Sequence, residues 1–202
     1  AVVSAVTTNS FVVTDGTNNF YVFKPATMAA IGDKVTVSGV KTTYGGIVET
    51  SQGAEVEVIE TGKTVEYTVA DDITATFDAY PASNTGKTSD YVTFTGKLVK
   101  SGNFYNVEVE GATTYKGSVS NPIAALGLDA LVDKTVDFTG YYVGTSGNST
   151  KYINFVCTKA EEYTRGGGGG GEQPTYASNI EWTLGENASS DLATVNDVAN
   201  VN

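Results

Sequence analysis

The side chains that could carry out chemistry in this sequence are almost all carboxylates. The chain has 23 Asp and Glu residues against 12 Lys and Arg residues, contains no histidine, and has a single cysteine, Cys157. Without histidine there can be no Ser-His-Asp or Cys-His catalytic pair, no H-E-x-x-H zinc site and no imidazole proton shuttle. One cysteine cannot close an intrachain disulfide or form a C-x-x-C metal site. Catalysis would therefore have to use carboxylates.

Three acidic groups could supply acids or metal ligands: Asp15, the pair Asp71-Asp72 and the pair Glu161-Glu162. Neighbouring residues on a strand point to opposite faces, so the adjacent glutamates cannot act together as the two carboxylates of a glycoside hydrolase do. The adjacent aspartates are better placed to cap a short helix. The stretch after Asp15 lacks the sixth-position Gly and the closing Glu of a calcium loop and is typical of a hairpin turn. We expect no catalytic residue, no metal site and no cofactor.

The composition is typical of a β protein. It is rich in Gly (23), Tyr (12), Thr and Val, and only 17% of the residues are charged. Short stretches alternate apolar and polar residues with a period of two and are separated by Gly, Asn, Asp and Ser. This pattern predicts strands at 5–14, 19–23, 34–40, 47–50, 54–59, 65–69, 91–98, 104–110, 114–118, 134–142 and 152–158.

Two helices are expected. Asn121 can cap a helix over 121–131, with Pro122 in its first turn and an apolar stripe formed by Ile123, Leu126, Ala130 and Leu131. A shorter helix of about two turns is expected from Asp71-Asp72 to Tyr80, because Pro81 would end it.

An internal repeat organises the chain. Ile31, Asp33-Lys34, Val37 and Ser38-Gly39 recur as Leu131, Asp133-Lys134, Phe138 and Thr139-Gly140 with one residue inserted, and Asn19-Phe20-Tyr21 recurs as Asn103-Phe104-Tyr105. Both halves run through three strands, a helix or loop, and two more strands. This is the element order of the OB-fold barrel.

The region 92–140, with its Gly-Asn-Phe-Tyr-Asn-Val turn and its Asp-Lys-x-Val-x-Phe-Thr-Gly strand, resembles tandem OB-fold-like modules in secreted or lipid-anchored multidomain surface proteins of anaerobic gut bacteria. The likeness covers residues 1 to about 163. It implies the fold, a location outside the cell or on the bacterial outer surface, and a further β domain after residue 175. It brings no catalytic motif.

The resulting prediction is an all-β protein with two five-stranded OB-fold-like barrels in series, at 1–62 and 91–163, joined by a connector at 63–90. Six consecutive glycines indicate a flexible linker at 164–175, because the sequence around them lacks the strand and the Lys-Ser/Thr helix start of a phosphate-binding loop. Residues 176–202 are interpreted as the start of a truncated further β domain. The sequence has no apolar stretch long enough to cross a membrane, so a lipid anchor would lie outside this chain.

Exposed aromatic residues are the candidate ligand-binding groups. Strands two and three of an OB barrel often present aromatic rings, and tyrosines among Thr, Asn and Gly can pack against sugars or protein partners. Alternatively, the same rings cover the joint between the two barrels. The candidates are Tyr21, Phe23, Tyr44, Phe104, Tyr115, Tyr141 and Tyr152.

The charge distribution favours a glycan or protein ligand over nucleic acid. Residues 1–62, 63–163 and 164–202 carry net charges of −3, −4 and −4, and Arg165 is the only arginine. Neutralisation of phosphates supplies most non-specific affinity for nucleic acid, so this balance disfavours it. The expected function is a non-enzymatic, surface-exposed binding or scaffold module. Single-stranded nucleic-acid binding is the alternative, and a glycoside hydrolase comes third.

Overall fold

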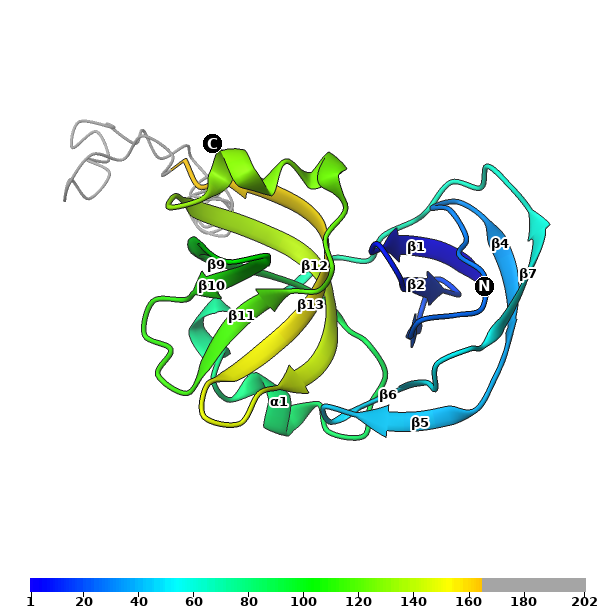
Figure 1. Cartoon of the computed structure of the whole chain (residues 1–202), viewed down its shortest axis with the longest axis horizontal. Helices are drawn as coiled ribbons and strands as arrows, with labels where there is room; N and C mark the ends of the chain where they lie inside the picture. The colour runs from blue at the N-terminus through cyan, green and yellow to red at the C-terminus, as the bar shows by residue number, and fades with distance from the viewer. Residues whose placement is uncertain (165–202) are drawn as a thin grey trace, which may run out of the picture. The chain divides into compact units, whose positions relative to one another are not determined.

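The computed structural model describes residues 1–164 and shows a mainly β structure (Figure 1). Residues 1–163 form one compact unit that holds a seven-stranded sheet and a six-stranded sheet. Most of the predicted linker and the whole of the predicted further β domain lie outside the described residues. The boundaries expected at residues 62 and 91 stay a prediction.

The second sheet contains a closed five-stranded barrel of OB-like order, as predicted for this half. Its strands pair in the ring β9-β10-β11-β13-β12 and back to β9. The pair β11–β13 is parallel and the other four pairs are antiparallel. The short strand β8 (Asp71–Asp72) adds to β9 outside the ring. The barrel strands are β9 (Tyr91–Ser101), β10 (Phe104–Glu108), β11 (Tyr115–Val119), β12 (Thr135–Ser146) and β13 (Lys151–Glu162).

Aromatic rings and small residues fill the barrel together. The ring of Phe94 lies 5.5 Å from that of Phe138 and 4.8 Å from that of Phe155, measured between centroids. A Cβ added at Gly96 would lie 2.6 Å from a methyl of Val107, and one at Gly117 would lie 2.9 Å from the Cβ of Val107. The two glycines therefore make room for an inward-facing branched side chain in a tightly packed core.

The first sheet is open, so the prediction of a barrel over residues 1–62 is wrong. Its order is β5-β6-β3-β2-β1-β4-β7, and its end strands, β5 and β7, do not pair with each other. The strands are β1 (Val2–Val6), β2 (Phe11–Thr14), β3 (Asn19–Val22), β4 (Lys34–Ser38), β5 (Lys41–Tyr44), β6 (Ile47–Thr50) and β7 (Glu55–Glu60).

The physical reason is an interruption of the last two strands of the repeat. The first sheet keeps the neighbours seen in the barrel, because β1 lies between β2 and β4, and β3 is parallel to β6. However, β12 and β13 have twelve residues each, whereas the corresponding stretches of the first half are divided into β4 and β5 and into β6 and β7. In the barrel the continuous strand β12 pairs with both β9 and β13. In the first sheet β4 pairs with β1 and β7 while the separate strand β5 pairs with β6, so the ring stays open at the break between β4 and β5.

The predicted helices are also corrected. The stretch 121–131 contains two short 3₁₀ turns, η2 (Ala124–Leu126) and η3 (Leu128–Leu131), separated by Gly127 at a left-handed φ of 61°. In the connector, Asp71-Asp72 forms β8, and the Asp72 carboxylate accepts the N–H of Thr74 at 2.9 Å, at the start of η1 (Thr74–Thr76). The short helix α1 (Tyr80–Ser83) follows, so the expected two-turn helix does not form. Pro81 lies in the first turn of α1, where a missing N–H is tolerated.

Two predicted strands differ as well. The stretch 5–14 is divided into β1 and β2 by a turn in which the N–H of Thr7 donates to the carbonyl of Ser10 at 2.8 Å. The predicted strand over 65–69 does not form. The alternation of apolar and polar residues is weak in this segment, and the segment has no strand to pair with.

The main hydrophobic core joins the barrel to the first sheet. It combines the barrel interior with four buried residues of the first sheet: Ala5, Val12, Tyr21 and Ile47. A second, smaller core lies within the first sheet around Val3, Phe11 and Val22. Cys157 is buried in the main core, as predicted, and burial raises the pKa of its thiol to about 12.

Candidate functional site

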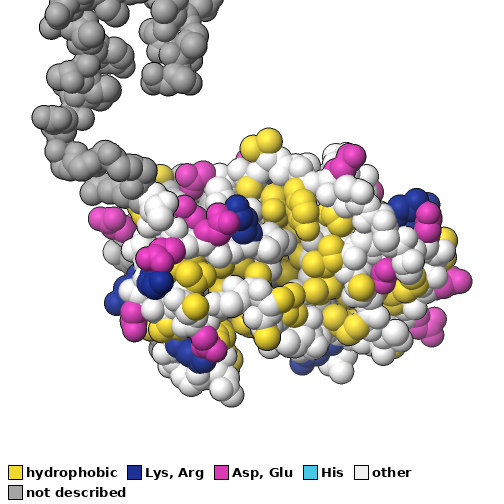
Figure 2. All heavy atoms as spheres, turned by 90° about the horizontal axis from the view of Figure 1, so that it is seen from above, with side chains coloured by type: hydrophobic (Ala, Val, Ile, Leu, Met, Phe, Trp, Pro, Cys, Tyr) yellow, Lys and Arg dark blue, Asp and Glu magenta, His cyan; other side chains and the backbone are white. Residues whose placement is uncertain are grey.

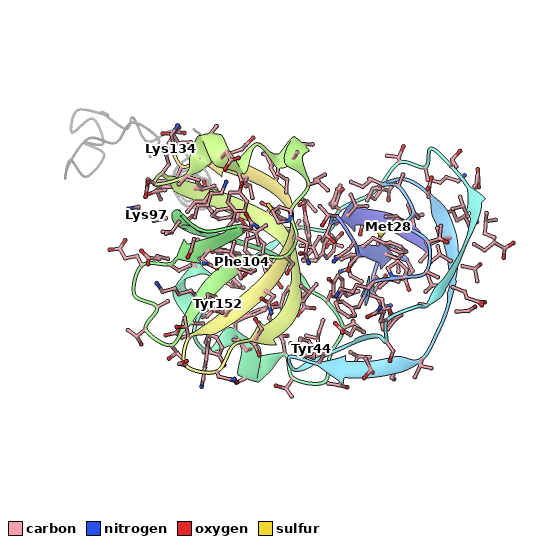
Figure 3. All side chains as sticks on the ribbon, viewed as in Figure 1. Met28, Tyr44, Lys97, Phe104, Lys134 and Tyr152 are labelled. Atoms are coloured by element: carbon pink, nitrogen blue, oxygen red, sulfur yellow. The ribbon has the colours of Figure 1, made fainter. Side chains whose placement is uncertain are left out.

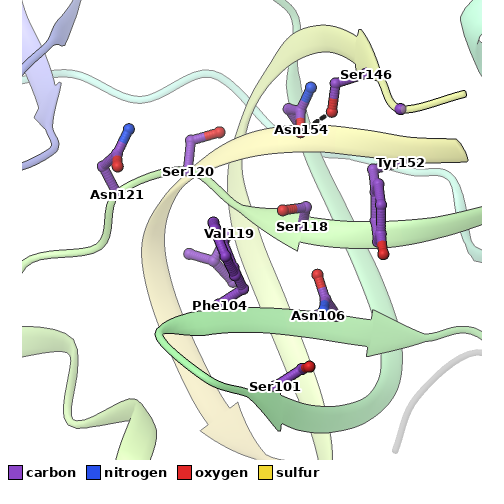
Figure 4. A pocket seen from close by; sticks show the side chains of 11 residues that line it. Ser101, Phe104, Asn106, Ser118, Val119, Ser120, Asn121, Ser146, Tyr152 and Asn154 are labelled. Atoms are coloured by element: carbon purple, nitrogen blue, oxygen red, sulfur yellow. Dashed lines mark hydrogen bonds between the residues drawn. The ribbon is translucent and has the colours of Figure 1, made fainter. Parts of the chain in front are cut away.

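The candidate site is a cavity of about 430 Å³ on the outer face of β10, β11 and β13 (Figure 4). Its volume falls in the range of about 300 to 1,000 Å³ typical of small-ligand pockets. The β9–β10 turn, the segment after β11 and the β12–β13 turn form its edges. The lining residues are Ser101, Phe104, Asn106, Ser118, Val119, Ser120, Asn121, Ser146, Gly147, Tyr152 and Asn154.

The strand register places a row of polar side chains across the floor of this pocket. Asn106 on β10 lies opposite Ser118 on β11, and Ser118 lies opposite Asn154 on β13. Successive side chains on a strand alternate between faces, so the buried neighbours Val107, Gly117 and Ile153 point into the barrel while this row points out. The result is an amide, a hydroxyl and an amide side by side.

Aromatic rings border this polar row. Phe104, two residues before Asn106, lies on one side, and Tyr152, two residues before Asn154, lies on the other (Figures 3 and 4). Phe104 is 70% exposed, so its ring gains little of the free energy that burial of an apolar side chain provides in the free protein. The pocket thus combines apolar ring surface with neutral hydrogen-bonding groups.

One hydrogen bond sets the orientation of Asn154. The hydroxyl of Ser146 donates to the Asn154 Oδ1 over 3.1 Å. With its oxygen engaged in this way, the Asn154 amide presents its NH₂ group as a donor.

Among residues 1–164, no charged side chain lines the pocket. Next to the pocket, Lys116 on β11 donates to Glu108 on β10 at 2.7 Å, and Lys151 on β13 lies over the ring of Tyr115. This hydrogen bond from Lys116 lowers the pKa of the Glu108 carboxyl, which is therefore ionised near neutral pH. The pocket therefore has an uncharged lining, and the charges of the Lys116–Glu108 ion pair beside it cancel.

Two of the seven predicted binding residues, Phe104 and Tyr152, line the pocket. Tyr115 lies at the start of β11, outside the pocket lining, with the ammonium of Lys151 5.9 Å from its ring centroid. Tyr44 is 60% exposed at the end of β5, and Phe23 is half-buried, 6.2 Å from the ring of Tyr21.

The expected exposure of Tyr21 and Tyr141 is wrong. Tyr21 is 5% exposed and Tyr141 is 2% exposed, and both belong to the main core. Tyr141 does point out of the barrel strand β12, since its neighbours Gly140 and Tyr142 face the interior. However, residues of the first sheet cover it, as the alternative interpretation anticipated.

The polar residues of the pocket were missed at the level of sequence. Asn106, Ser118 and Asn154 occupy outward positions of strands, where polar residues are the ordinary solvent-facing choice. A usable signal was present: Phe104 and Asn106, and Tyr152 and Asn154, are aromatic–amide pairs with the same two-residue spacing. Pairing the strands in OB order would have placed these pairs on one face.

The acidic candidates have structural roles. The Asp15 carboxylate accepts the N–H groups of Thr17 and Asn18 and shapes the β2–β3 turn, as predicted. Glu161 pairs with Lys159, and Glu162 pairs with Lys134. Within residues 1–164 there is no group of three or more metal-ligating side chains. The helices of this part of the chain are also too short to cross a membrane.

Comparison with known proteins does not add a family to this description. No family model matches the chain, and neither a curated protein nor a solved structure matches it significantly. The structure shows a mostly β protein with a closed OB-like barrel and a second sheet. The resemblance to surface-protein modules stays a prediction.

Proposed function

We propose that the chain is a non-enzymatic binding module whose barrel holds an uncharged, hydroxyl-rich ligand, best a glycan, in the pocket between Phe104 and Tyr152. The observation that supports this most directly is the neutral row of Asn106, Ser118 and Asn154 between the two rings. Sugars combine apolar C–H faces with hydroxyl groups that donate and accept hydrogen bonds. An aromatic ring can pack against the C–H faces, and amides and hydroxyls can form hydrogen bonds with the sugar hydroxyl groups.

Binding is preferred over catalysis because of what lines the pocket. Its lining consists of serines, asparagines, a glycine, a valine and two aromatic residues, and includes no carboxylate. Hydrolysis of a glycoside requires two carboxyl groups that flank the bond to be cleaved. The described pocket offers hydrogen bonds and ring faces, which are the tools of recognition.

The pairing of the barrel lysines disfavours nucleic acid. Five of the barrel lysines each form a salt bridge with a carboxylate (Lys97, Lys100, Lys116, Lys134 and Lys159), and the sixth, Lys151, lies over the ring of Tyr115. On the face shown in Figure 2, most of the basic side chains lie beside acidic ones, and the basic groups are scattered. A single strand of nucleic acid needs a positive groove along its phosphates, in addition to stacking rings.

A location outside the cell or on the bacterial surface fits this role and is part of the proposal. The net charge of −11 would keep the chain soluble and away from anionic surfaces. A protein loop with polar and aromatic groups is the other ligand that the same pocket could take.

A binding panel tests the proposal. The full chain would be titrated with neutral glucan, mannan and xylan oligosaccharides, with polygalacturonate, and with single-stranded DNA. We expect binding to a neutral oligosaccharide that depends weakly on salt and is lost in Phe104→Ala and Tyr152→Ala. Tyr163→Ala, which changes an exposed tyrosine after β13 and outside the pocket lining, is the matched control. Binding only to DNA, with steep salt dependence, or to no oligosaccharide would overturn the glycan proposal.

A further inference from the structure

The wall of the pocket that contains Ser146 and Gly147 is formed by the end of β12 and its turn into β13. The last pairing of β12 with β9 is Tyr141 with Tyr91, whereas its pairing with β13 continues to Ser146. This end of β12 therefore has no further pairing with β9 along its other edge. An exposed backbone N–H at such an edge needs another partner.

The first sheet supplies that partner. At the tip of the β5–β6 hairpin, the carbonyl oxygen of Gly45 accepts two hydrogen bonds from Thr145, one from its N–H at 2.8 Å and one from its hydroxyl at 3.2 Å. Thr145 directly precedes Ser146, the pocket residue that orients Asn154. Residues a hundred positions apart are thus joined next to the pocket.

The backbones meet without room for a side chain. A Cβ added at Gly45 would lie 2.4 Å from the carbonyl oxygen of Thr145, and one at Gly144 would lie 2.9 Å from the oxygen of Gly45. Both glycines also have left-handed φ angles, 56° and 88°. The contact therefore requires glycine on each side for steric reasons as well as conformational ones.

The hairpin is fixed on its other side too. The N–H of Gly86 donates to the carbonyl of Gly46 at 2.7 Å, and the N–H of Val48 donates to the carbonyl of Lys87 at 2.8 Å. The connector therefore holds the hairpin where it meets β12. A tip secured by backbone hydrogen bonds from two segments is a rigid support rather than a loose contact.

We propose that the β5–β6 hairpin is a positioning element for the pocket, acting through Gly45 on Thr145 and through Ser146 on Asn154. The consequence for ligand binding rests on the proposed function, whereas the mechanical link does not. Gly45 and Thr145 are positioning residues in this scheme, since neither lines the pocket. The first sheet then contributes to recognition without contacting the ligand.

Nuclear magnetic resonance of the ¹⁵N-labelled full chain tests the link without any ligand. In Gly45→Ala we expect hydrogen exchange at the Thr145 N–H to rise about tenfold or more, and the side-chain NH₂ signals of Asn154 to shift. The matched control is Gly127→Ala, since Gly127 has a similar φ of 61° and nothing within 4 Å of an added Cβ. The control should leave both signals unchanged.

If Gly45→Ala does not fold, Thr145→Val replaces it in the experiment. This variant removes the hydrogen bond from the Thr145 hydroxyl to Gly45 and keeps the branched shape of the side chain. It should shift the Asn154 signals in the same direction by a smaller amount. Faster exchange at Thr145 with unshifted Asn154 signals, in either variant, would overturn the proposed link.

A double-mutant cycle with the neutral oligosaccharide panel connects the link to binding. If Gly45 acts through Asn154, the loss of affinity in Gly45→Ala should largely disappear in an Asn154→Ala background and persist in a Ser101→Ala background, which removes a different lining hydroxyl. Equal losses in both backgrounds would contradict the inference. Failure of the whole panel to bind would count against the proposed glycan function alone, since the resonance experiment decides the link separately.

Discussion

Gly32 in the first sheet and Asp133 before the fourth barrel strand occupy the same structural position. Both have a left-handed φ, 88° and 67°. Gly32 donates its N–H to the carbonyl of Val3 on β1 at 3.0 Å, and Asp133 donates its N–H to the carbonyl of Leu98 on β9, the first barrel strand, at 2.8 Å. The return bonds run from Val3 to Asp33 and from Leu98 to Lys134. At this junction Gly32 and Asp33 align with Asp133 and Lys134 at an offset of 101 residues, whereas Val3 and Leu98 are 95 residues apart. Val37 and Phe138 are also 101 residues apart, so no insertion is needed between this junction and the strands that follow it.

This equivalence predicts opposite effects of two substitutions. Asp133→Gly should stabilise the protein by about 0.5 kcal/mol, because glycine adopts a left-handed φ without steric cost. Gly32→Ala should cost about 2 kcal/mol or more, since its Cβ would lie 2.7 Å from the carbonyl oxygen of Lys63. Urea denaturation of both variants measures the difference. Destabilisation by Asp133→Gly would show that its ion pair with Lys97 outweighs the backbone strain.

Glu49 should make stability depend on pH. Its side chain is 3% exposed on β6 opposite Tyr21, and burial raises the pKa of its carboxyl from about 4.5 to about 7. Between these values the unfolded state loses its proton first, so the free energy of unfolding should fall as pH rises, by on the order of 3 kcal/mol, and level off above about pH 7. Denaturation at pH 5 and pH 8 measures this fall.

Glu49→Gln should remove that pH dependence and make the protein more stable than the wild type at pH 8. Glu55→Gln, on the exposed strand β7, is the control and should leave the profile unchanged. A Glu49→Gln variant that keeps the full slope would assign the pH dependence to other groups.

Asp78 should be important for closing the loop before β11. Its carboxylate accepts the N–H groups of Thr113, Thr114 and Tyr115 at 2.7, 2.9 and 2.9 Å. Burial by itself would raise the pKa of Asp78, but these donors lower it overall. The stabilisation should therefore be complete above about pH 4 and be lost as the pH falls below that value.

Asp78→Ala should cost about 1 to 2 kcal/mol at pH 7, since three backbone donors lose their acceptor. Asp78→Asn keeps one acceptor oxygen and should recover part of the loss. The melting temperatures of both variants at pH 7 provide the measurement, and equal values for Asp78→Ala and the wild type would disprove the role.

Two tyrosines named together as binding candidates should behave differently when truncated. Tyr141→Ala should cost about 3 to 5 kcal/mol, because the ring is buried against Tyr91 at a centroid distance of 4.8 Å. Tyr44→Ala should change stability by less than about 0.5 kcal/mol, because its side chain is 60% exposed. Thermal denaturation compares them directly. If Tyr141→Ala lowers the free energy of unfolding by much less than this, the side chains between the two sheets must repack into the space left by the ring.

Alternation of apolar and polar residues was sufficient to predict the β class, the order of the barrel strands and the core position of Cys157. These properties depend on local periodicity and on turn residues, which a single sequence displays directly. The repeat likewise predicted that both halves share a strand order, and their common hydrogen bonds at Val3 and Leu98 agree with it.

The tertiary structure alone decided what each outward side chain faces. Tyr141 and Phe104 both point away from the barrel interior, yet one is covered by the first sheet and the other lies open beside Asn106. The same holds for the division of β4 from β5, for Gly127 breaking a helical pattern, and for the meeting of Gly45 with Thr145. Each of these features depends on contacts with atoms from distant parts of the chain. The alternation of residues along one strand does not indicate which distant atoms will approach it.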